Sequence, residues 1–433
     1  MRTHLTRDAV AAMALVTAML TAAAPVRAQL GNASASGLAL SSNNTALVRG
    51  FAAISVNPAG LAMPGSGFSL ALAPAQARVG LAPVTLSDLA RFEGMVVPTA
   101  TKESWLSAIE AAGGQTVLVR GDVSALALTI GSVGLQVSTV GSATMNLPVG
   151  AAEAILFGNA GRTGSASDLD LTGLDVDAFV LTTGALSWGF PVGRVKLGVT
   201  GKYIVGNGLG ILRSSSGSIS SNPIRLTLNA PVVATCEDEI AGVCTQDLAG
   251  GGKGYGLDVG FMMDLPSLTI GASIQNLVNT FAWDVTTLSY RAGSVLVEEG
   301  SSDADFDESS YGLAPESLRQ IVEEFTMKPI VRLGVALDLS TGLTLTGDVH
   351  RRLSDGGIKF RPKNHAGVGA EFRGLKILHL RAGAAVTTNG RQYSGGVSLV
   401  LGPVNLSAAT AVRKGGPLDD ATFGQFTVSF GNR

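Results

Sequence analysis

The sequence predicts an all-β fold, a transmembrane antiparallel β-barrel of about 14 strands. Apolar and polar residues alternate along most of the chain, as in strands whose two faces meet different surroundings. Only 15% of the 433 residues are charged, and the mean hydropathy is +0.34. No segment after residue 28 approaches the ~20 continuous apolar residues of a membrane helix. A sheet with one lipid-facing side accounts for the low charge, because that side carries none.

The N-terminus has the features of a secretory signal peptide. Basic residues within 2–7 precede an apolar run over 9–24, and Pro25 ends that run. Small residues around Ala28 suit a signal peptidase. The alternative, a short membrane anchor, would need a longer run that is less rich in alanine. We therefore expect residues 1–28 to be removed and the protein to be exported to the bacterial outer membrane.

Charge and cysteine content exclude several classes of partner. The formal net charge is −2, whereas a nucleic-acid partner requires a basic surface. Cys236 and Cys244 lie close together in a polar stretch, and no second Cys/His pair completes a zinc site. In an exported protein such a pair forms a disulfide more readily than a metal site. The sequence predicts this disulfide, with no metal, no cofactor and no nucleic acid.

Fourteen segments carry the alternation, an even number as expected of a bacterial single-chain barrel. In the clearest segment, Val195, Val199 and Val205 share one face, whereas Lys196 and Lys202 share the other. One face would meet lipid and the other a hydrated lumen. The predicted strands are 67–79, 123–131, 133–141, 175–190, 194–205, 254–264, 268–280, 329–339, 343–353, 365–373, 376–386, 392–401, 403–413 and 422–430.

Short and long connections alternate between these segments, as periplasmic turns and extracellular loops do in such barrels. Gly131-Ser132 and Pro191-Val192-Gly193 are examples of the short turns. The long link 206–253 carries both cysteines, and we place it outside the cell. The predicted outer loops are 80–122, 142–174, 206–253, 281–328, 354–364, 387–391 and 414–421.

The last predicted strand ends close to the C-terminus, with Phe426, Val428 and Phe430 on one face. This pattern resembles the signal by which the barrel-assembly machinery recognises its clients. Residues 431–433 extend past the final phenylalanine and depart from that signal. The expected partners are therefore the barrel-assembly machinery and outer-membrane lipid.

Several charged side chains fall on the lumen-facing side of the predicted strands. No set of serine, histidine and acid supplies a nucleophile with its base, so we predict no enzymatic activity and no catalytic residue. Charges that pair across the lumen are the expected role. The candidate lumen-facing residues are Lys196, Lys202, Arg332, Asp348, His350, His379 and Arg381.

The most specific motif is Asn57-Pro58-Ala59-Gly60-Leu61, within the stretch Gly37 to Met63. This stretch resembles the start of the FadL-type long-chain fatty-acid transport barrels and of their PorV/PorQ-type and TraF-like relatives. Further segments extend the resemblance over most of the chain and are closest to the TraF-like and uncharacterised branches. These segments are 155–160, 198–203, 271–277 and 347–350.

In that superfamily, the segment before the first strand folds into the lumen. The resemblance implies that residues 29–66 form an N-terminal luminal plug segment and that residues 67–433 form the barrel. The plug bend would lie at Asn57, Pro58, Ala59 and Gly60, because proline donates no backbone hydrogen bond and disfavours helix at the preceding residue. Local chemistry alone fits an ordinary loop equally well.

Two amphipathic helices are predicted within the outer loops. Leu318 and Val322 recur at helical spacing within 315–325, and Leu106 and Ile109 do so in an earlier loop. Such helices would either cap the barrel mouth or form an apolar access site for a ligand.

The resemblance implies a channel or transporter for hydrophobic small molecules such as fatty acids. The alternative is a non-transporting outer-membrane scaffold of PorV type that serves protein secretion or surface attachment. A lateral opening or an apolar lumen pocket would favour transport, whereas a filled lumen with large ordered loops would favour the scaffold.

Overall fold

The computed structural model describes residues 30–31, 34–65, 67–158, 162–163, 169–213, 215–221, 224–235, 251–298, 301–340, 342–354, 362–415 and 421–431. The predicted signal peptide and the predicted disulfide between Cys236 and Cys244 lie outside these residues. Among the described helices, none is both long and apolar enough to cross a bilayer.

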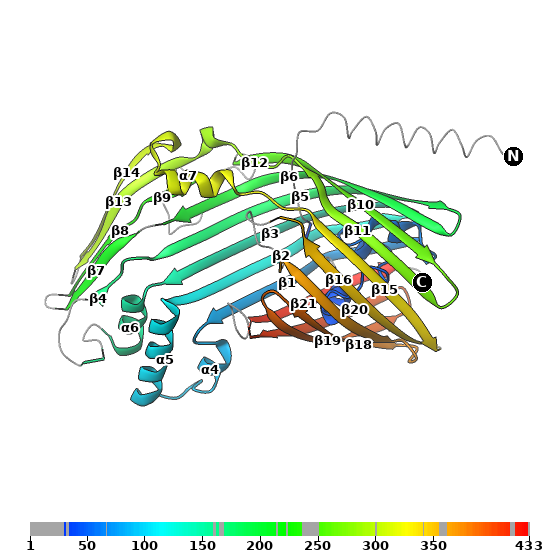
Figure 1. Cartoon of the computed structure of the whole chain (residues 1–433), viewed down its shortest axis with the longest axis horizontal. Helices are drawn as coiled ribbons and strands as arrows, with labels where there is room; N and C mark the ends of the chain where they lie inside the picture. The colour runs from blue at the N-terminus through cyan, green and yellow to red at the C-terminus, as the bar shows by residue number, and fades with distance from the viewer. Residues whose placement is uncertain are drawn as a thin grey trace.

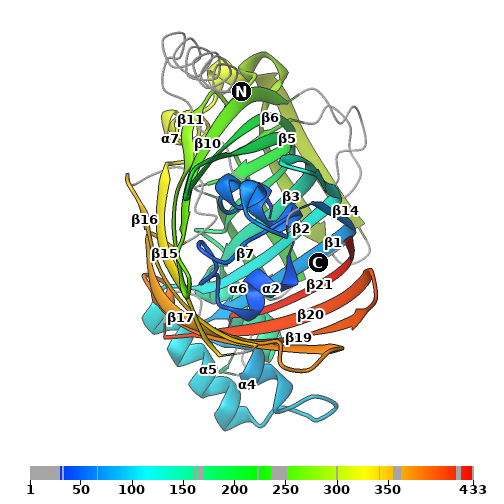
Figure 2. The same cartoon turned by 90° about the vertical axis from the view of Figure 1, so that its right-hand side faces the viewer.

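Fourteen antiparallel strands of the described chain form a closed barrel (Figures 1 and 2). The first and last strands pair to close the ring, with Leu70 opposite Phe430. All fourteen predicted segments form strands, so the predicted fold class is confirmed. The barrel strands are β1 (Phe68–Ala82), β2 (Gln115–Ile130), β3 (Val133–Leu147), β5 (Asp175–Val192), β6 (Val195–Leu212), β10 (Gly252–Asp264), β11 (Leu268–Asn279), β15 (Ile330–Ser340), β16 (Leu343–Arg352), β17 (Asn364–Phe372), β18 (Leu378–Thr387), β19 (Gly390–Leu401), β20 (Val404–Lys414) and β21 (Ala421–Gly431).

The two faces of each strand differ as the alternation predicts. On β15 the side chains of Leu333 and Val335 are 56% and 46% exposed, whereas that of Arg332 is 1% exposed. The outer surface of the barrel is therefore apolar, as a lipid-facing surface must be. The polar side chains point inward and find protein partners there.

Several strands are longer than predicted at the end of the barrel that carries the long loops, called here the long-loop end. β2 begins at Gln115 rather than 123, β3 continues to Leu147 rather than 141, and β6 continues to Leu212 rather than 205. Beyond the lipid, the outer face of a strand needs no apolar side chains, so alternation no longer marks the strand. Figure 1 shows these strands extending toward the end that carries α4 (Leu86–Ala90), α5 (Thr99–Ala112) and α6 (Val149–Phe157).

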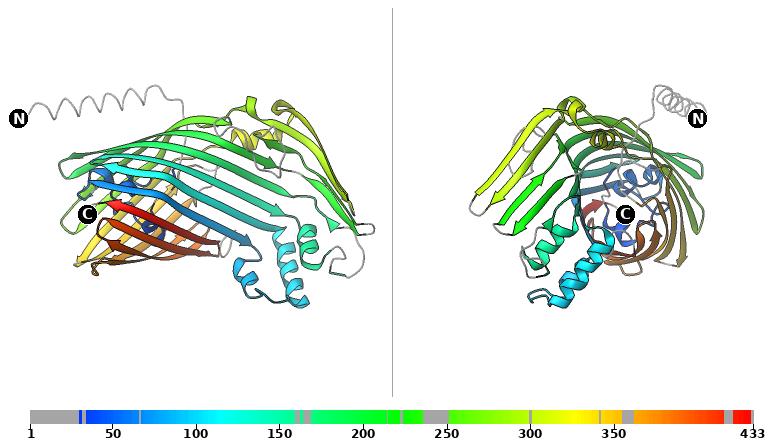
Figure 3. Two further views of the ribbon diagram at one scale, coloured as in Figure 1. Left: turned by 180° about the vertical axis from the view of Figure 1, so that it is seen from behind. Right: turned by 60° about the vertical axis from the view of Figure 1, so that its left-hand side comes forward.

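Three predicted outer loops, 142–174, 206–253 and 281–328, contain added strands, which corrects the sequence-based prediction. β13 pairs with β8, β9 and β14, so the sheet continues beyond the ring (Figure 3). Segment 301–310 is rich in serine and aspartate, and its pairing depends on backbone hydrogen bonds that side-chain patterns do not reveal. The added strands are β7 (Ser216–Ser221), β8 (Ile224–Asn229), β9 (Val232–Ala234), β13 (Ser289–Glu298) and β14 (Ser301–Ser310), with short strands β4 (Leu169–Asp170) and β12 (Ala282–Trp283).

Both predicted amphipathic helices form at the long-loop end. α5 (Thr99–Ala112) ends at Gly113, whose φ of 75° suits a glycine cap. α7 (Glu316–Glu323) follows Pro315 and buries Leu318 and Val322. The other helical turns there are α4 (Leu86–Ala90), α6 (Val149–Phe157), η2 (Val285–Thr287) and η3 (Tyr311–Leu313).

Residues 34–65, called here the N-terminal segment, lie inside the ring of strands (Figure 2). The segment forms three short helices, α2 (Ala35–Ala39), α3 (Phe51–Ile54) and η1 (Pro58–Ala62). Its apolar residues, including Ile54 and Leu61, are buried. The lumen at this level is therefore filled with protein.

Candidate functional site: the barrel interior

The motif Asn57-Pro58-Ala59-Gly60 joins the N-terminal segment to the wall. Asn57 has an extended backbone and Pro58 begins η1, so the chain turns between them. The Asn57 side-chain amide donates to the carbonyl of Thr45 at 3.0 Å and to that of Phe261 on β10 at 3.1 Å, and its oxygen accepts from the amide of Ala59 at 3.3 Å. One asparagine thus caps a helical turn and bridges to a barrel strand.

Glycines on the inner wall allow the segment to approach the strands closely. A Cβ atom at Gly198 of β6 would collide with the backbone of Pro58, and one at Gly260 of β10 would collide with the side chain of Asn57. Every wall strand that meets the segment in this way needs a glycine, because any side chain would push the segment away. The same close approach occurs at Gly134, Gly189, Gly271, Gly334, Gly367, Gly369, Gly383 and Gly396.

Arg332 and Asp348, both predicted to face the lumen, bind the N-terminal segment. The carboxylate of Asp348 accepts from the backbone amide of Thr45 at 3.0 Å and from its hydroxyl at 2.5 Å. Arg332 donates to the Thr45 hydroxyl and to the carbonyl of Ser42, each at 2.9 Å. The guanidinium lies 3.5 Å from the Asp348 carboxylate. Both charges are buried, and all of these contacts of Asp348 use its Oδ2 atom, whereas its Oδ1 atom has no hydrogen-bond partner among the described residues.

His350, another predicted residue, stacks on His365. Their ring centroids are 4.3 Å apart and the planes differ by 6°. The Nε2 atom of His350 lies 3.0 Å from Asp348, and that of His365 lies 2.9 Å from the side-chain oxygen of Asn43. The sequence analysis missed His365, although it faces His350 across the β16–β17 ladder.

Lys202 lies on a separate part of the wall. Its ammonium group is 2.6 Å from Asp258 and 2.9 Å from the side-chain oxygen of Asn276, and all three residues are buried. Sequence analysis missed Asp258, which occupies an apolar-looking stretch of β10.

The remaining candidates do not join these contacts. Lys196 lies beside the turn at the other end of β6 and donates to the carbonyl of Gly193 at 2.7 Å. Arg381 pairs with Glu371 of β17 at 2.6 Å. His379 is buried on the same inner face of β18. The predicted residues therefore fall into several separate groups along the wall.

A cavity of about 100 Å³ lies between the N-terminal segment and a group of arginines. Arg78 of β1 and Arg413 of β20 lie over the ring of Phe423, at 4.9 and 5.0 Å from its centroid. Arg120 pairs with Asp122 at 2.9 Å. We call Arg78, Arg120 and Arg413 the arginine group. Sequence analysis missed it, although all three lie on the inward faces of predicted or extended strands.

Arg413 retains hydrogen-bonding capacity. Its Nη2 atom donates to Gln392 at 2.6 Å, whereas its Nε and Nη1 atoms have no hydrogen-bond partner among the described residues. The side chain is 5% exposed. Buried unpaired donors are costly in a folded protein, so this arginine is suited to hold an anion.

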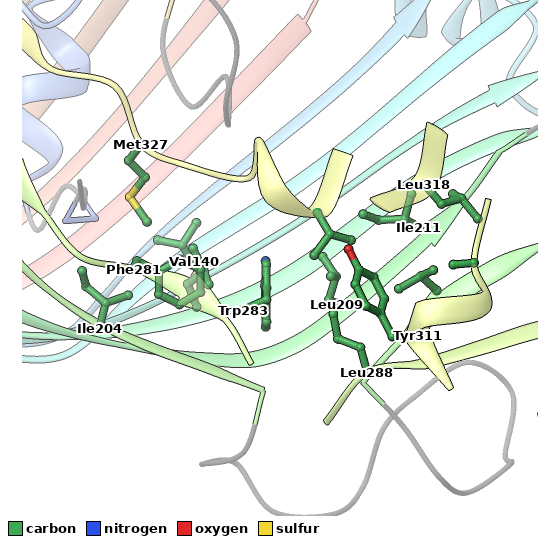
Figure 4. Close-up of a cluster of buried hydrophobic side chains, with 14 residues drawn as sticks. Val140, Ile204, Leu209, Ile211, Phe281, Trp283, Leu288, Tyr311, Leu318 and Met327 are labelled. Atoms are coloured by element: carbon green, nitrogen blue, oxygen red, sulfur yellow. The ribbon is translucent and has the colours of Figure 1, made fainter. Parts of the chain in front are cut away.

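Apolar side chains pack together at the long-loop end (Figure 4). α7 contributes Leu318 and Val322, and the rings of Phe281 and Trp283 meet edge to face at 5.2 Å. The β5–β6 register shifts between Val180 and Leu181, and beyond this shift Leu209 and Ile211 are buried like Ile204 before it. This outer apolar cluster comprises Val140, Leu181, Ile204, Leu209, Ile211, Val233, Phe281, Trp283, Leu288, Tyr311, Ala314, Leu318, Val322 and Met327.

The wall is irregular at β1. Ala73 has a positive φ of 44° and precedes Pro74, which donates no hydrogen bond. Pairing with β2 and with β21 stops at Leu72 and resumes at Ala75. The ladder is thus interrupted on both sides of one strand, next to the seam that closes the barrel.

Comparisons with known proteins agree with this architecture. The chain is similar to the Ralstonia pickettii toluene transporter TbuX, with 12% identity over 93% of this chain and 97% of that one and a TM-score of 0.52. It is also similar to a mutant of the TodX monoaromatic hydrocarbon channel, with 11% identity over 91% of this chain and 97% of that one and a TM-score of 0.54. The chain has the fold of these channels. The resemblance to FadL-type barrels is confirmed at the level of the fold.

Sequence-family comparisons match parts of the chain. Residues 77–280 match a family of unknown function (DUF5723), and residues 223–349 match the F plasmid transfer operon TraF protein family. The second match agrees with the TraF-like resemblance of the sequence motifs. No curated protein matches the chain.

Proposed function

We propose that the protein is an outer-membrane channel for hydrophobic small molecules, with the N-terminal segment as its plug. The outer apolar cluster carries the proposal, because its buried apolar side chains give the long-loop end of the barrel an interior suited to an apolar molecule. Channels of the same fold are described as carrying toluene and other monoaromatic hydrocarbons. The shared fold supports transport, and the cargo follows from the side chains of the barrel interior.

The arginine group favours a cargo that carries a carboxylate. A fatty acid joins an apolar chain, which suits the outer apolar cluster, to an anionic head, which suits the unpaired donors of Arg413. A neutral hydrocarbon would leave those donors unpaired. Within the class of hydrophobic molecules, we therefore propose fatty acids as the cargo.

The contacts of the N-terminal segment support its role as a plug. Thr45 is held by Asp348 and Arg332, and Asn57 is held by β10. These bonds hold the segment across the lumen. Removal of the segment would leave an open lumen lined by the wall glycines. The interruption at Ala73 and Pro74 is the place where an apolar cargo would pass sideways into the bilayer, since the pairing of β1 with both neighbouring strands stops there.

Uptake measurements test the proposal. A strain without the gene should take up radiolabelled oleate more slowly than the complemented strain. Replacement of both Arg78 and Arg413 by alanine should lower oleate uptake about tenfold and leave toluene uptake unchanged, because only the charged head loses its partners. If the strain without the gene takes up oleate and toluene as fast as the complemented strain, transport is rejected. If the double arginine variant loses oleate and toluene uptake to the same extent, the carboxylate assignment is rejected.

The alternative is a scaffold of PorV type. The filled lumen and the ordered outer sheet of β7, β8, β9, β13 and β14 favour it, since a scaffold needs a surface and no passage. Deletion of residues 289–310, which removes β13 and β14, separates the two functions. A channel should keep its uptake after the deletion, whereas a scaffold should lose its secreted or surface-attached partner.

A further inference from the structure

A groove of about 1040 Å³ lies on the outward face of the barrel and crosses β11, β15, β16, β17, β18 and β19. Its sides are exposed apolar residues, among them Leu333, Val349 and Val386. Its floor consists of small residues, which make the surface concave. The floor residues are Ala272, Gly347, Ala366 and Ala384.

The strand register makes the groove continuous. Leu333 is opposite Val349, Val349 is opposite Ala366, and Ala366 is opposite Val386. Val386 is in turn opposite Arg391, next to the hairpin between β18 and β19 at the long-loop end. The groove therefore climbs from the middle of the wall to its long-loop rim.

Close packing inside the barrel holds the floor of this groove in place. A Cβ atom at Gly271 would lie 2.7 Å from the carbonyl oxygen of Thr45, and one at Gly367 would lie 2.6 Å from the side-chain oxygen of Asn43. At Gly271 and Gly367 the wall has no inward side chain and rests directly on the N-terminal segment. The groove is thus a preformed surface and not a gap between mobile side chains.

Basic side chains stand at the upper end of the groove. Arg391 lines it, and Lys414 is the cross-strand neighbour of Arg391. Arg351 follows the groove residue Val349 on the same face of β16 and is exposed. Neither Arg351 nor Arg391 forms an ion pair with another described residue.

We propose that this groove binds a phosphorylated lipid of the outer leaflet, with an acyl chain in the groove and separate phosphate groups on Arg391 and Arg351, which lie three strands apart. An apolar groove on a lipid-facing wall admits acyl chains, and two arginines at the membrane surface attract an anionic head group. Tyr393, half exposed beside Arg391, adds an amphipathic ring at the level of the head groups. The site lies on the opposite side of the wall from the lumen, and it does not depend on transport.

Native mass spectrometry of the whole barrel in detergent tests the proposal. The delipidated protein is titrated with lipid A and, separately, with phosphatidylethanolamine. We expect a one-to-one adduct with lipid A. The double variant Arg351→Ala, Arg391→Ala should weaken it about 30-fold, from a loss of roughly fivefold per arginine at the surface. The double variant Gly347→Leu, Ala384→Leu, which fills the floor and keeps both charges, should also weaken it.

A matched control removes two exposed basic residues at the opposite rim, Arg194 and Lys376, by substitution with alanine. This control should bind lipid A like the wild type. Unchanged binding in the arginine variant, or equal loss in the control, would overturn the proposal. A protein dimer that forms in place of the lipid adduct would assign the groove to a second copy of the chain and would also overturn it.

Discussion

The carboxylate of Asp348 on β16 accepts two hydrogen bonds from Thr45 in the N-terminal segment, one from the backbone amide and one from the hydroxyl. The two residues are 303 positions apart. Arg332 completes the contact from the neighbouring strand. The link between barrel and segment thus depends on a buried ion pair, in which removal of one partner leaves the other charge without compensation.

Asp348→Asn should therefore lower the free energy of unfolding by roughly 3 kcal/mol, since it leaves the guanidinium of Arg332 buried without its carboxylate. Urea unfolding followed by tryptophan fluorescence measures this loss. Asp338→Asn, at an exposed position of β15, is the matched control and should change stability by less than about 0.5 kcal/mol. Similar values for the two variants would contradict the role given to Asp348.

Deletion of Gly31 to Met63 should give a barrel that still assembles and conducts more current in planar bilayers. The wall strands hydrogen-bond to one another and need no bond from the segment to stay closed. A mobility shift on heating in detergent gels checks that the deleted protein is folded. A folded barrel with wild-type conductance would mean that the segment is not a plug.

Within the segment, Asn57→Ala should raise conductance more than Pro58→Ala does. Asn57 bonds to Thr45, Ala59 and β10 through its side chain, whereas Pro58 occupies the first position of a helical turn, where its missing amide has no intrahelical partner. Single-channel recordings of the two variants give the comparison. A larger leak from Pro58→Ala would show that backbone restraint matters more than the side-chain bridge.

Gly198→Val should displace the N-terminal segment, because its side chain would occupy the position of the Pro58 backbone. The expected result is raised conductance together with a stability loss of about 1–3 kcal/mol, typical of overpacking. Gly184→Val on β5 is the matched control, since a Cβ atom there meets nothing within 4 Å. Equal effects of the two variants would show that valine disturbs the strands rather than the segment.

The cysteine prediction tests orientation. If the loop 206–253 faces outward, Cys236 and Cys244 should react with an impermeant maleimide on whole cells after reduction, and not before it. Mass analysis of the labelled peptide counts the modified thiols. If labelling occurs only after cell lysis, either the strands run in the opposite direction or the loop is buried.

The membrane-spanning part of the fold could be predicted from the sequence because every second residue of such a strand faces lipid and is therefore apolar. Val195, Val199 and Val205 follow this pattern, and so do the other thirteen predicted segments. Beyond the lipid the pattern ends, and strands such as β14 have no side-chain pattern that distinguishes them from a solvated loop. The outer sheet was therefore missed.

The interior could be predicted only in part, for a similar reason. Arg332 and Asp348 interrupt apolar runs and were therefore identified as lumen-facing. Asp258, His365 and the arginine group were not, because the side chains around them come from several strands and from the N-terminal segment. Which of these side chains lie together is visible only in the closed barrel. The contacts of Asn57 with Phe261 and of Thr45 with Asp348 likewise depend on the closed barrel.

The pairing of β1 with β21 also constrains the order of assembly. β1 can pair with β21 only after the C-terminal residues have been exported. The β1–β21 seam is therefore the last part of the wall to form. The N-terminal segment precedes β1 and touches strands all around the circumference. It must therefore be in place before the seam joins, since a completed ring would admit it only from an open end. The earliest exported residues of the barrel would then act as a core around which the later strands wrap.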